Sequence, residues 1–181
     1  MTPARRHDPQ RKQRIVEAAV GVIAQHGLVG TTHRRVAAAA DVPLGSVTYH
    51  FESLEDLCRQ AFEWHADRMW RSYAAHVEGV VDRPGLVDAL TALVCGDAGA
   101  DADDWAVAYE LYLAALRRPA LRAVTERWMA ASRSVLERVV DPITARGVDA
   151  LVEGLVMHRV LALEPMPEST VRAAIARAVD P

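Results

Sequence analysis

Residues 31–57 read TTHRRVAAAADVPLGSVTYHFESLEDL, and this stretch decides the fold that the sequence predicts. One of the two leading threonines can cap a short helix that ends at Asp41. A tight turn then leads to a second short helix over residues 43–50, where Pro43 suits the first helical position. Two short helices joined by a tight turn are typical of a helix-turn-helix DNA reader.

The second of these helices has little apolar content, which suits a reading edge better than a core. Ala37 and Ala40 are small enough for the preceding helix to pack closely, and Val42 and Val47 can fill the core. The remaining polar and exposed-type side chains are predicted to face outward, where they can reach base edges: Leu44, Ser46, Thr48, Tyr49 and His50.

Apolar residues recur at helical spacing along almost the whole chain, and no alternating strand pattern is present. The first helix is predicted over about residues 9–26, with Asp8 as its cap, Pro9 in its first turn and Gly27 as its stop. Ser53 is the predicted cap of a fourth helix that reaches about Gly79.

Five more helices are predicted after a break at residues 82–85. They run from Leu86 to Val94, from Trp105 to Leu116, from Pro119 to a stop at Asp141 and Pro142, onward from Gly147, and from behind Pro165 and Pro167 to Val179. About nine helices predict an all-α fold. We expect a three-helix N-terminal domain over residues 1–51 and a helical bundle over residues 52–181.

Composition places the chain among globular proteins. Of 181 residues, 51% are hydrophobic and 25% are charged, which supplies enough apolar surface for a core and excludes overall disorder. No apolar run suggests a transmembrane helix, and the N-terminal arginines precede a periodic segment rather than a signal-peptide block, so a cytoplasmic protein without membrane association is expected. Cys58 and Cys95 are far apart and are expected to be buried thiols.

Charge is distributed unevenly along the chain. The net charge of −3 divides into +4 through His50 and −7 in the remainder. A basic end attached to an acidic body indicates a nucleic-acid-facing N-terminus. The cluster Arg5, Arg6, Arg11 and Lys12 fits equally an arm attracted to phosphates or an ordinary solvated face.

The segment from Thr31 to Leu57 resembles the N-terminal domain of TetR-type transcriptional regulators, over about residues 9–60. This resemblance implies a set of DNA-contacting positions: Thr32, Arg34, Leu44, Gly45, Ser46, Thr48, Tyr49 and His50. Phe51 is more simply interpreted as a core aromatic residue than as a DNA contact, and His33 as a solvated side chain.

Three residues depart from the family pattern. Asp41 replaces the usual glycine of the turn, Pro43 replaces a serine that opens the third helix, and Leu54 replaces a lysine at the start of the fourth. Because the lysine would contact a phosphate, we expect a shallower salt dependence of DNA binding than in relatives.

The resemblance also implies that the body is a ligand-binding and dimerisation domain with a pocket between helices four and eight. Aromatic and polar residues on inward faces are the candidate lining: Trp64, Arg68, Trp105, Tyr109, Tyr112, Trp128 and His158. Any one of the aromatics can instead be plain core. A buried Arg68 would indicate an anionic effector, and an ion pair with an acid of another helix is its alternative.

The eighth helix is apolar on more than one side, with only a narrow polar strip at Asp149 and Glu153. With the ninth helix it predicts an isologous two-fold dimer interface. The candidate interface residues are Leu151, Gly154, Leu155, Leu161, Val171 and Ile175.

No catalytic motif, cofactor motif or metal-binding motif is present in the body. The acidic cluster Asp97, Asp101, Asp103 and Asp104 lacks calcium-loop spacing and is expected to be a solvated loop, with Asp103 or Asp104 as a helix cap. We therefore expect no enzyme, no cofactor and no metal site. A small helical enzyme using His65, His158 or the acidic cluster is one alternative.

The sequence as a whole predicts a homodimeric, ligand-responsive regulator, most simply a repressor. It would bind a palindromic operator in double-stranded DNA, with half-sites about 34 Å apart, and a small-molecule effector would release it. The main alternative is a helical ligand-binding or adaptor protein that no longer binds DNA specifically.

Overall fold

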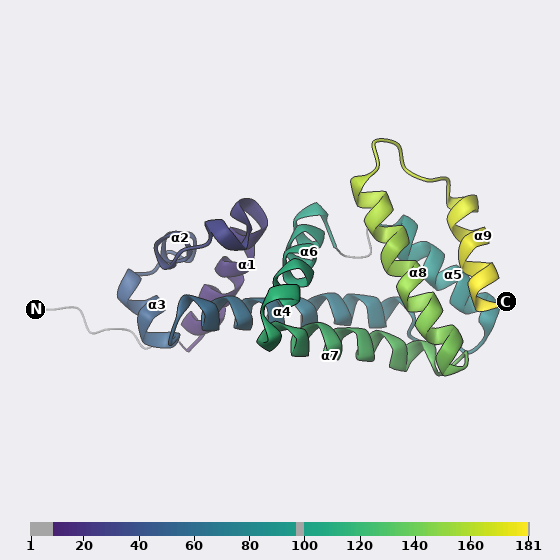
Figure 1. Ribbon diagram of the computed structural model, residues 1–181, viewed down its shortest axis with the longest axis horizontal. Coiled ribbons are helices and arrows are strands. Elements are labelled where there is room, and N and C mark those ends of the chain that lie inside the picture. Colours follow the sequence, from purple (N-terminus) through teal and green to yellow (C-terminus); the bar gives the residue numbers. More distant parts are fainter. Residues whose placement is uncertain (1–8, 97–99, 181) are drawn as a thin grey trace, which may run out of the picture.

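The computed structural model describes residues 9–96 and 100–180, and these residues form nine helices and no strand. Figure 1 shows a small three-helix unit at one end, two long helices along the long axis, and the last helices at the other end. The all-α prediction is confirmed. Asp8, Arg5, Arg6 and Asp97, which carried predictions, lie outside the described residues. The helices are α1 (Arg11–Gly30), α2 (His33–Ala39), α3 (Leu44–His50), α4 (Leu54–His76), α5 (Arg83–Cys95), α6 (Ala102–Arg117), α7 (Pro119–Leu136), α8 (Pro142–Leu161) and α9 (Glu168–Val179).

Helix α1 begins later and ends later than its sequence pattern predicts. Gln10 is its N-terminal cap, so Pro9 lies outside the helix rather than in its first turn. Gly27 has a positive φ of 65°, which favours glycine, and it kinks the chain without ending the helical assignment, which continues to Gly30. The Thr31 hydroxyl donates a hydrogen bond to the Gly27 carbonyl at 2.9 Å and closes this end.

The turn between α2 and α3 has the predicted chemistry with one change. Thr32 caps α2 by accepting a hydrogen bond from the Arg35 N–H at 3.2 Å. Asp41 has a φ of 51°, the left-handed conformation that its place in the turn requires. Pro43 is the cap residue before α3 rather than its first helical residue, with φ −58° and ψ 142°.

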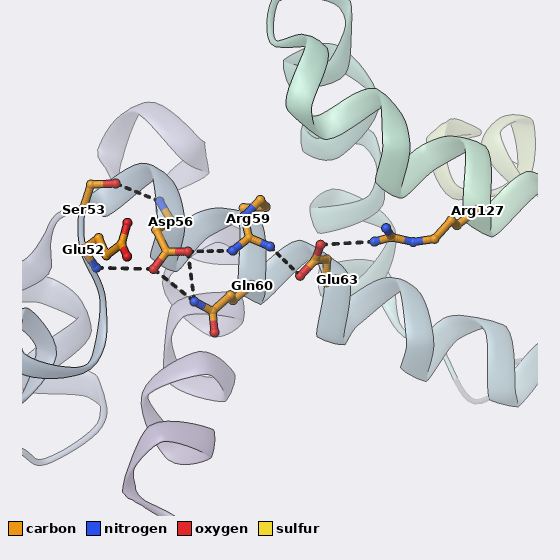
Figure 2. A network of polar contacts seen from close by, with 7 residues as sticks. All are labelled: Glu52, Ser53, Asp56, Arg59, Gln60, Glu63 and Arg127. Atoms are coloured by element: carbon orange, nitrogen blue, oxygen red, sulfur yellow. Dashed lines mark hydrogen bonds and ion pairs between the residues drawn. The ribbon is translucent and has the colours of Figure 1, made fainter.

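Helix α4 begins at the predicted Ser53 cap, whose hydroxyl accepts a hydrogen bond from the Asp56 N–H at 3.0 Å, and ends at His76 rather than Gly79. Figure 2 shows the polar network that extends from this cap along the helix. Arg59 bridges Asp56 at 2.7 Å and Glu63 at 2.8 Å, and Glu63 also binds Arg127 of α7 at 3.1 Å. The network ties the start of α4 to α7.

Two predicted breaks are helix starts. The segment at residues 82–85 opens α5, because the Asp82 carboxylate caps it by accepting from the Gly85 N–H at 2.8 Å. Asp101, rather than Asp103 or Asp104, is the cap of α6, and Asp104 completes a reciprocal capping box by binding the Asp101 N–H.

The seventh and eighth helices divide at a different place from the prediction. Helix α7 ends at Leu136, before the predicted stop. Asp141 and Pro142 start α8, because the Asp141 carboxylate accepts hydrogen bonds from the next turn and Pro142 occupies the first position. Gly147 therefore lies inside α8 and does not precede it.

Two apolar cores stabilise the described structure. The first joins α1, α2 and α3 to the first half of α4 and to α6 and α7, and includes Phe51, Phe62 and Leu111. The second joins α5, α8 and α9 to the end of α7 and includes Leu90, Leu136 and Ile175. Because the first core crosses the predicted boundary at residue 51, that boundary stays a prediction about which segment reads DNA.

Helices α4 and α7 pack along each other and connect the two ends of the molecule, as Figure 1 shows. Helix α6 stands beside them and also contacts α1. None of the described helices is both long enough and apolar enough to cross a membrane. Cys58 is buried as predicted, and Cys95 is half-buried.

Candidate functional site

Helix α3 packs on the first core with one side and exposes its other side to solvent. Val47 is fully buried and Phe51 is 3% exposed, and both belong to the first core. On the other side Tyr49 is 83% exposed and Leu44 is 46% exposed. A short helix fixed by its apolar side and exposed on the other is the geometry that base reading needs.

The polar groups on the exposed face of α3 make a few contacts within the protein and keep hydrogen-bonding capacity for another partner. The Tyr49 ring meets the half-buried His50 ring edge to face, with centroids 5.1 Å apart. The Thr48 hydroxyl donates to the Gly45 carbonyl at 3.4 Å. A Cβ added at Gly45 would meet no other atom within 4 Å, so open space lies in front of this residue. Of the predicted reading residues on α3, only Ser46 and His50 are half-buried.

Thr32 and Arg34 lie at the start of α2 and are both exposed. Since the Thr32 hydroxyl oxygen already accepts from the Arg35 N–H, its own proton is left to donate. A hydroxyl donor beside an exposed guanidinium can bind a phosphate. Their exposed placement agrees with the role that the resemblance implies.

Leu54 has a structural reason to be leucine. It is half-buried and packs against the first core, beside the Ser53 cap. Lys12, by contrast, places its Nζ 5.6 Å from the centre of the Phe51 ring, at the foot of α3. The positively charged side chain next to the C-terminal end of α3 is therefore Lys12 of α1.

The reading unit is attached to the body through a charged hydrogen bond. The Glu110 carboxylate of α6 accepts from the Leu28 N–H at 3.1 Å, at the end of α1. A Cβ built on Gly27 would lie 2.9 Å from the Glu110 Oε1. The glutamate tip could shift away from a Cβ, so the positive φ of 65° is the stronger reason for glycine at this position.

A cavity lies in the body between α4, α5, α6, α7 and α8. The space between its side chains is about 620 Å³, counting the part that opens to solvent. Three predicted ligand residues line it: Trp105, Tyr112 and Trp128. The Tyr112 and Trp128 rings stack with centroids 5.8 Å apart and planes 27° from parallel. Figure 1 shows α7 running past α6 and on to α8, so that α6 and α8 stand on different parts of α7.

The cavity also holds two acidic side chains of α8 that sequence reasoning did not select, Asp149 and Glu153. Burial raises the pKa of Asp149 to about 6, although Arg133, 3.6 Å away, opposes this shift. Burial likewise raises the pKa of Glu153, against the hydrogen bond that the Tyr112 hydroxyl donates to it. The signal was present in the sequence, because these two acids stand four residues apart in the otherwise apolar stretch of residues 148–157.

Other lining residues that the sequence did not single out come mainly from α4 and α7. They are Met69, Ser72, Tyr73, Met129 and Ser132. The Tyr73 hydroxyl is buried without a hydrogen-bond partner among the described residues, and burial raises its pKa. Serine and methionine at helical spacing do not differ in a sequence from ordinary helix residues, so only the structure identifies them as cavity-lining positions.

The remaining predicted ligand residues lie elsewhere. Arg68 pairs with Asp104 of α6 and stacks its guanidinium over the Trp64 ring, so the ion-pair alternative is correct for this residue. Trp64 itself packs against the first core. Tyr109 stacks on Trp105 with centroids 6.2 Å apart but does not line the cavity.

His158 is exposed near the end of α8 and does not line the cavity. It lies five residues, more than one helical turn, beyond Glu153. His65, by contrast, is fully buried, and its Nε2 lies 2.9 Å from the Asp104 carbonyl, to which it must donate. Burial lowers the pKa of His65 to about 4, so the ring is neutral at pH 7.

The predicted dimer residues divide into two groups. Val171, Ile175 and Leu155 are buried in the second core of the same chain, so their side chains are not available to a partner. Leu151 and Gly154 are half-buried, and Leu161 is 71% exposed. The exposed face of α8 is mostly apolar or small at helical spacing, with Arg146 and His158 as its polar members; the apolar and small residues are Ile143, Gly147, Ala150 and Leu161, with the half-buried Gly154 between them.

Within residues 9–96 and 100–180, no three histidine, cysteine or acidic side chains gather as metal ligands would. Asp101 and Asp104 are instead used by the α6 cap and by Arg68. Asp103 is exposed in the first turn of the same helix.

Two segments of the chain match descriptions of one protein family. Residues 15–61 match the description "Bacterial regulatory proteins, tetR family", and residues 81–181 match "Tetracyclin repressor-like, C-terminal domain". The chain belongs to the TetR family. It is a transcriptional regulator of that family, with an N-terminal helix-turn-helix unit and a C-terminal helical domain.

Relatives of this TetR-family chain match it over nearly its whole length. SCO7518 of Streptomyces coelicolor A3(2) is 42% identical with a TM-score of 0.88, covering 96% of this chain and all of that one. The multidrug binding protein EbrR, solved in complex with ethidium, is 40% identical with a TM-score of 0.79, covering 93% and 98%. The transcriptional regulator CymR of Pseudomonas putida is 27% identical, covering 82% of this chain and 74% of its own.

Proposed function

We propose that this chain is a homodimeric repressor that binds a palindromic DNA operator through α2 and α3 and leaves it when a small molecule occupies the cavity of the body. The observation that carries the proposal is that one helix, α6, contributes Trp105 and Tyr112 to the cavity and Glu110 to the junction with α1. A ligand that moves α6 therefore acts on both places at once.

DNA binding is supported by the exposed face of α3 and by the charge of the N-terminal segment. Eight residues are proposed to contact DNA: Thr32, Arg34, Leu44, Gly45, Ser46, Thr48, Tyr49 and His50. Because the partner is chromosomal DNA, we propose a cytoplasmic location. A regulatory role without chemistry agrees with the family, and the buried neutral His65 is poorly placed for the enzymatic alternative.

Dimer formation is supported by the exposed face of α8. A C2 interface requires one self-complementary patch, and small residues such as Gly147, Ala150 and Gly154 allow two helices to approach closely. No atom lies within 4 Å of a Cβ built on Gly154, so this face is open in the protomer. Two-fold symmetry then places the half-sites of the operator about 34 Å apart.

Control by a ligand is supported by the cavity and by a relative. EbrR, which is similar to this chain over almost its full length, has been solved with ethidium, proflavin and malachite green. The effector must favour a conformation that spaces the reading helices differently, since a ligand without differential affinity shifts no equilibrium.

The test is selection of bound sequences from a random double-stranded DNA pool. An enriched palindrome is expected, and Tyr49→Ala should lose its enrichment while its thermal unfolding matches that of wild type. Salt-sensitive binding without enrichment would contradict the proposal and favour the ligand-binding adaptor. The enriched palindrome then serves as the probe in a screen for compounds that release it.

A further inference from the structure

We propose that the cavity selects flat aromatic monocations and that Glu153 holds the charge of the ligand. The inference rests on the proposed function, because it names the effector class of the same cavity. It reverses the anionic effector that a buried Arg68 would have indicated.

The shape argument comes from the aromatic walls. Tyr73 of α4, Trp105 and Tyr112 of α6, and Trp128 of α7 line the cavity from three helices. Aromatic faces carry partial negative charge, so they attract cations and stack with flat rings. A planar cation satisfies both preferences, whereas a planar anion meets repulsion from every ring face.

The charge argument comes from the acids. Asp149 and Glu153 are the only charged residues that line the cavity within the described chain. Asp149 has a cationic partner, because Arg133 lies 3.6 Å from its carboxylate. Among the described residues, Glu153 has only a neutral partner, the Tyr112 hydroxyl. The cavity therefore lacks one positive charge, and a monocation supplies it.

Burial explains why that missing charge matters. Glu153 is half-buried, and this burial raises its pKa because the carboxylate is less well solvated there than in open water. Asp149, one turn away, feels Arg133 and Arg146 as well as Glu153. A bound cation beside Glu153 compensates a carboxylate that has no cationic partner in the part of the chain that the structure describes.

The groove next to the cavity carries charges of both signs. It shares Leu93 and Trp105 with the cavity and contains Arg68 and Arg159 together with two acids, Asp101 and Asp104. Arg68 is paired with Asp104. The cavity itself has no cationic side chain among its lining residues in the described chain, so an anion between the aromatic walls gains no charged partner there, whereas a cation gains Glu153.

The test compares two probes of nearly the same shape. The 10-methylacridinium ion is a permanent monocation, and acridine is neutral at pH 8. Fluorescence titration of the full chain without DNA gives both dissociation constants. We expect wild type to bind the cation more tightly, and Glu153→Gln to weaken the cation on the order of thirtyfold while changing acridine affinity by less than about threefold.

Glu126→Gln on the exposed face of α7 is the matched control and should change neither constant. Retained acridine binding shows that the Glu153→Gln cavity is still folded. Equal affinity of wild type for the two probes, or cation binding unaffected by Glu153→Gln, would overturn the inference.

The operator separates this inference from the proposed function. Because acridinium ions also bind DNA, operator release is scored as the difference between wild type and Glu153→Gln at the same probe concentration. Glu153-dependent binding without a difference in release would contradict ligand control and leave the cation site standing. Operator binding without Glu153-dependent probe binding would contradict the cation site alone.

Discussion

The Glu110 carboxylate on α6 accepts a hydrogen bond from the Leu28 N–H at the end of α1, at 3.1 Å. The contact joins two segments that are 82 residues apart in sequence, across the junction of the reading unit and the body. It lies on the same helix as Trp105 and Tyr112, which line the cavity. The junction and the cavity are thus two regions of one rigid element.

Removing this carboxylate should weaken the junction. We expect Glu110→Ala to lower the free energy of unfolding by about 1 to 2 kcal/mol, because a hydrogen bond to a charged group is lost. It should also reduce the factor by which a cavity ligand changes operator affinity. Glu110→Gln, which keeps an acceptor, should retain most of both quantities. Urea unfolding and operator titrations with and without ligand measure them, and an unchanged factor in Glu110→Ala would show that the contact is structural only.

A lysine in place of Leu54 tests the expected shallow salt dependence of DNA binding. A lysine there can keep its aliphatic stem on the first core while its ammonium reaches a phosphate. We expect Leu54→Lys to steepen the plot of log affinity against log salt by about 0.9 for each half-site. Leu54→Gln is the neutral control and should leave the slope unchanged. An identical slope in all three proteins would mean that this position does not face the DNA backbone.

The buried His65 should make stability fall in acid. Its pKa is about 4 in the folded protein because burial and the Arg68 charge disfavour the imidazolium, so below pH 6.5 the unfolded chain binds the proton more tightly. The folded state therefore loses about 3 kcal/mol as the pH falls from 6.5 to 4. His65→Gln keeps an N–H that can donate to the Asp104 carbonyl and removes the titration.

Urea unfolding of both proteins between pH 7.5 and pH 4.5 checks this expectation. At high pH, wild type should have a larger free energy of unfolding than His65→Gln, and this difference should shrink or reverse as the pH falls. Parallel curves would show that His65 does not titrate on unfolding in this range.

The exposed face of α8 predicts the assembly. Ala150→Glu places a charge in the middle of the stripe formed by Ile143, Gly147, Gly154 and Leu161, so a two-fold interface would bury two like charges close together. We expect this variant to sediment as a monomer with an unchanged helical spectrum. Ala130→Glu, on an exposed position of α7, should sediment as wild type does. A dimeric Ala150→Glu protein would place the interface elsewhere.

Local sequence patterns identified some features of this fold and not others. The cap at Ser53, the left-handed turn at Asp41 and the outward face of α3 follow from side-chain chemistry acting within a few residues. The same local patterns did not locate the start of α8, because they are ambiguous there. Asp141 followed by Pro142 fits the end of one helix and the beginning of the next equally well, and only the hydrogen bonds to the Asp141 carboxylate decide between them.

Burial against a distant element leaves no local trace. The apolar faces of α8 and α9 show that Leu155, Val171 and Ile175 are buried, but periodicity does not distinguish a partner chain from the chain's own core. Likewise, Asp149 and Glu153 form a polar strip in the sequence, which suggests solvent. Only the packing of α8 against α7, together with the hydrogen bond between Glu153 and Tyr112 of α6, turns that strip toward the cavity.

The cation proposed for the cavity should bind more weakly in acid. Burial raises the pKa of Asp149 to about 6, and the groups that act on it are Arg133, Arg146 and Glu153. Below this pH Asp149 gains a proton, and a cation must bind a less negative cavity or expel that proton. Since cation binding and proton binding oppose each other, 10-methylacridinium affinity should fall by up to about tenfold per pH unit below 6 for each proton expelled and level off above pH 7. Titrations from pH 5 to pH 8 measure this dependence. Asp149→Asn should flatten the profile near pH 6, and a wild-type profile that is flat across the range would show that the ligand does not sense the acids of α8.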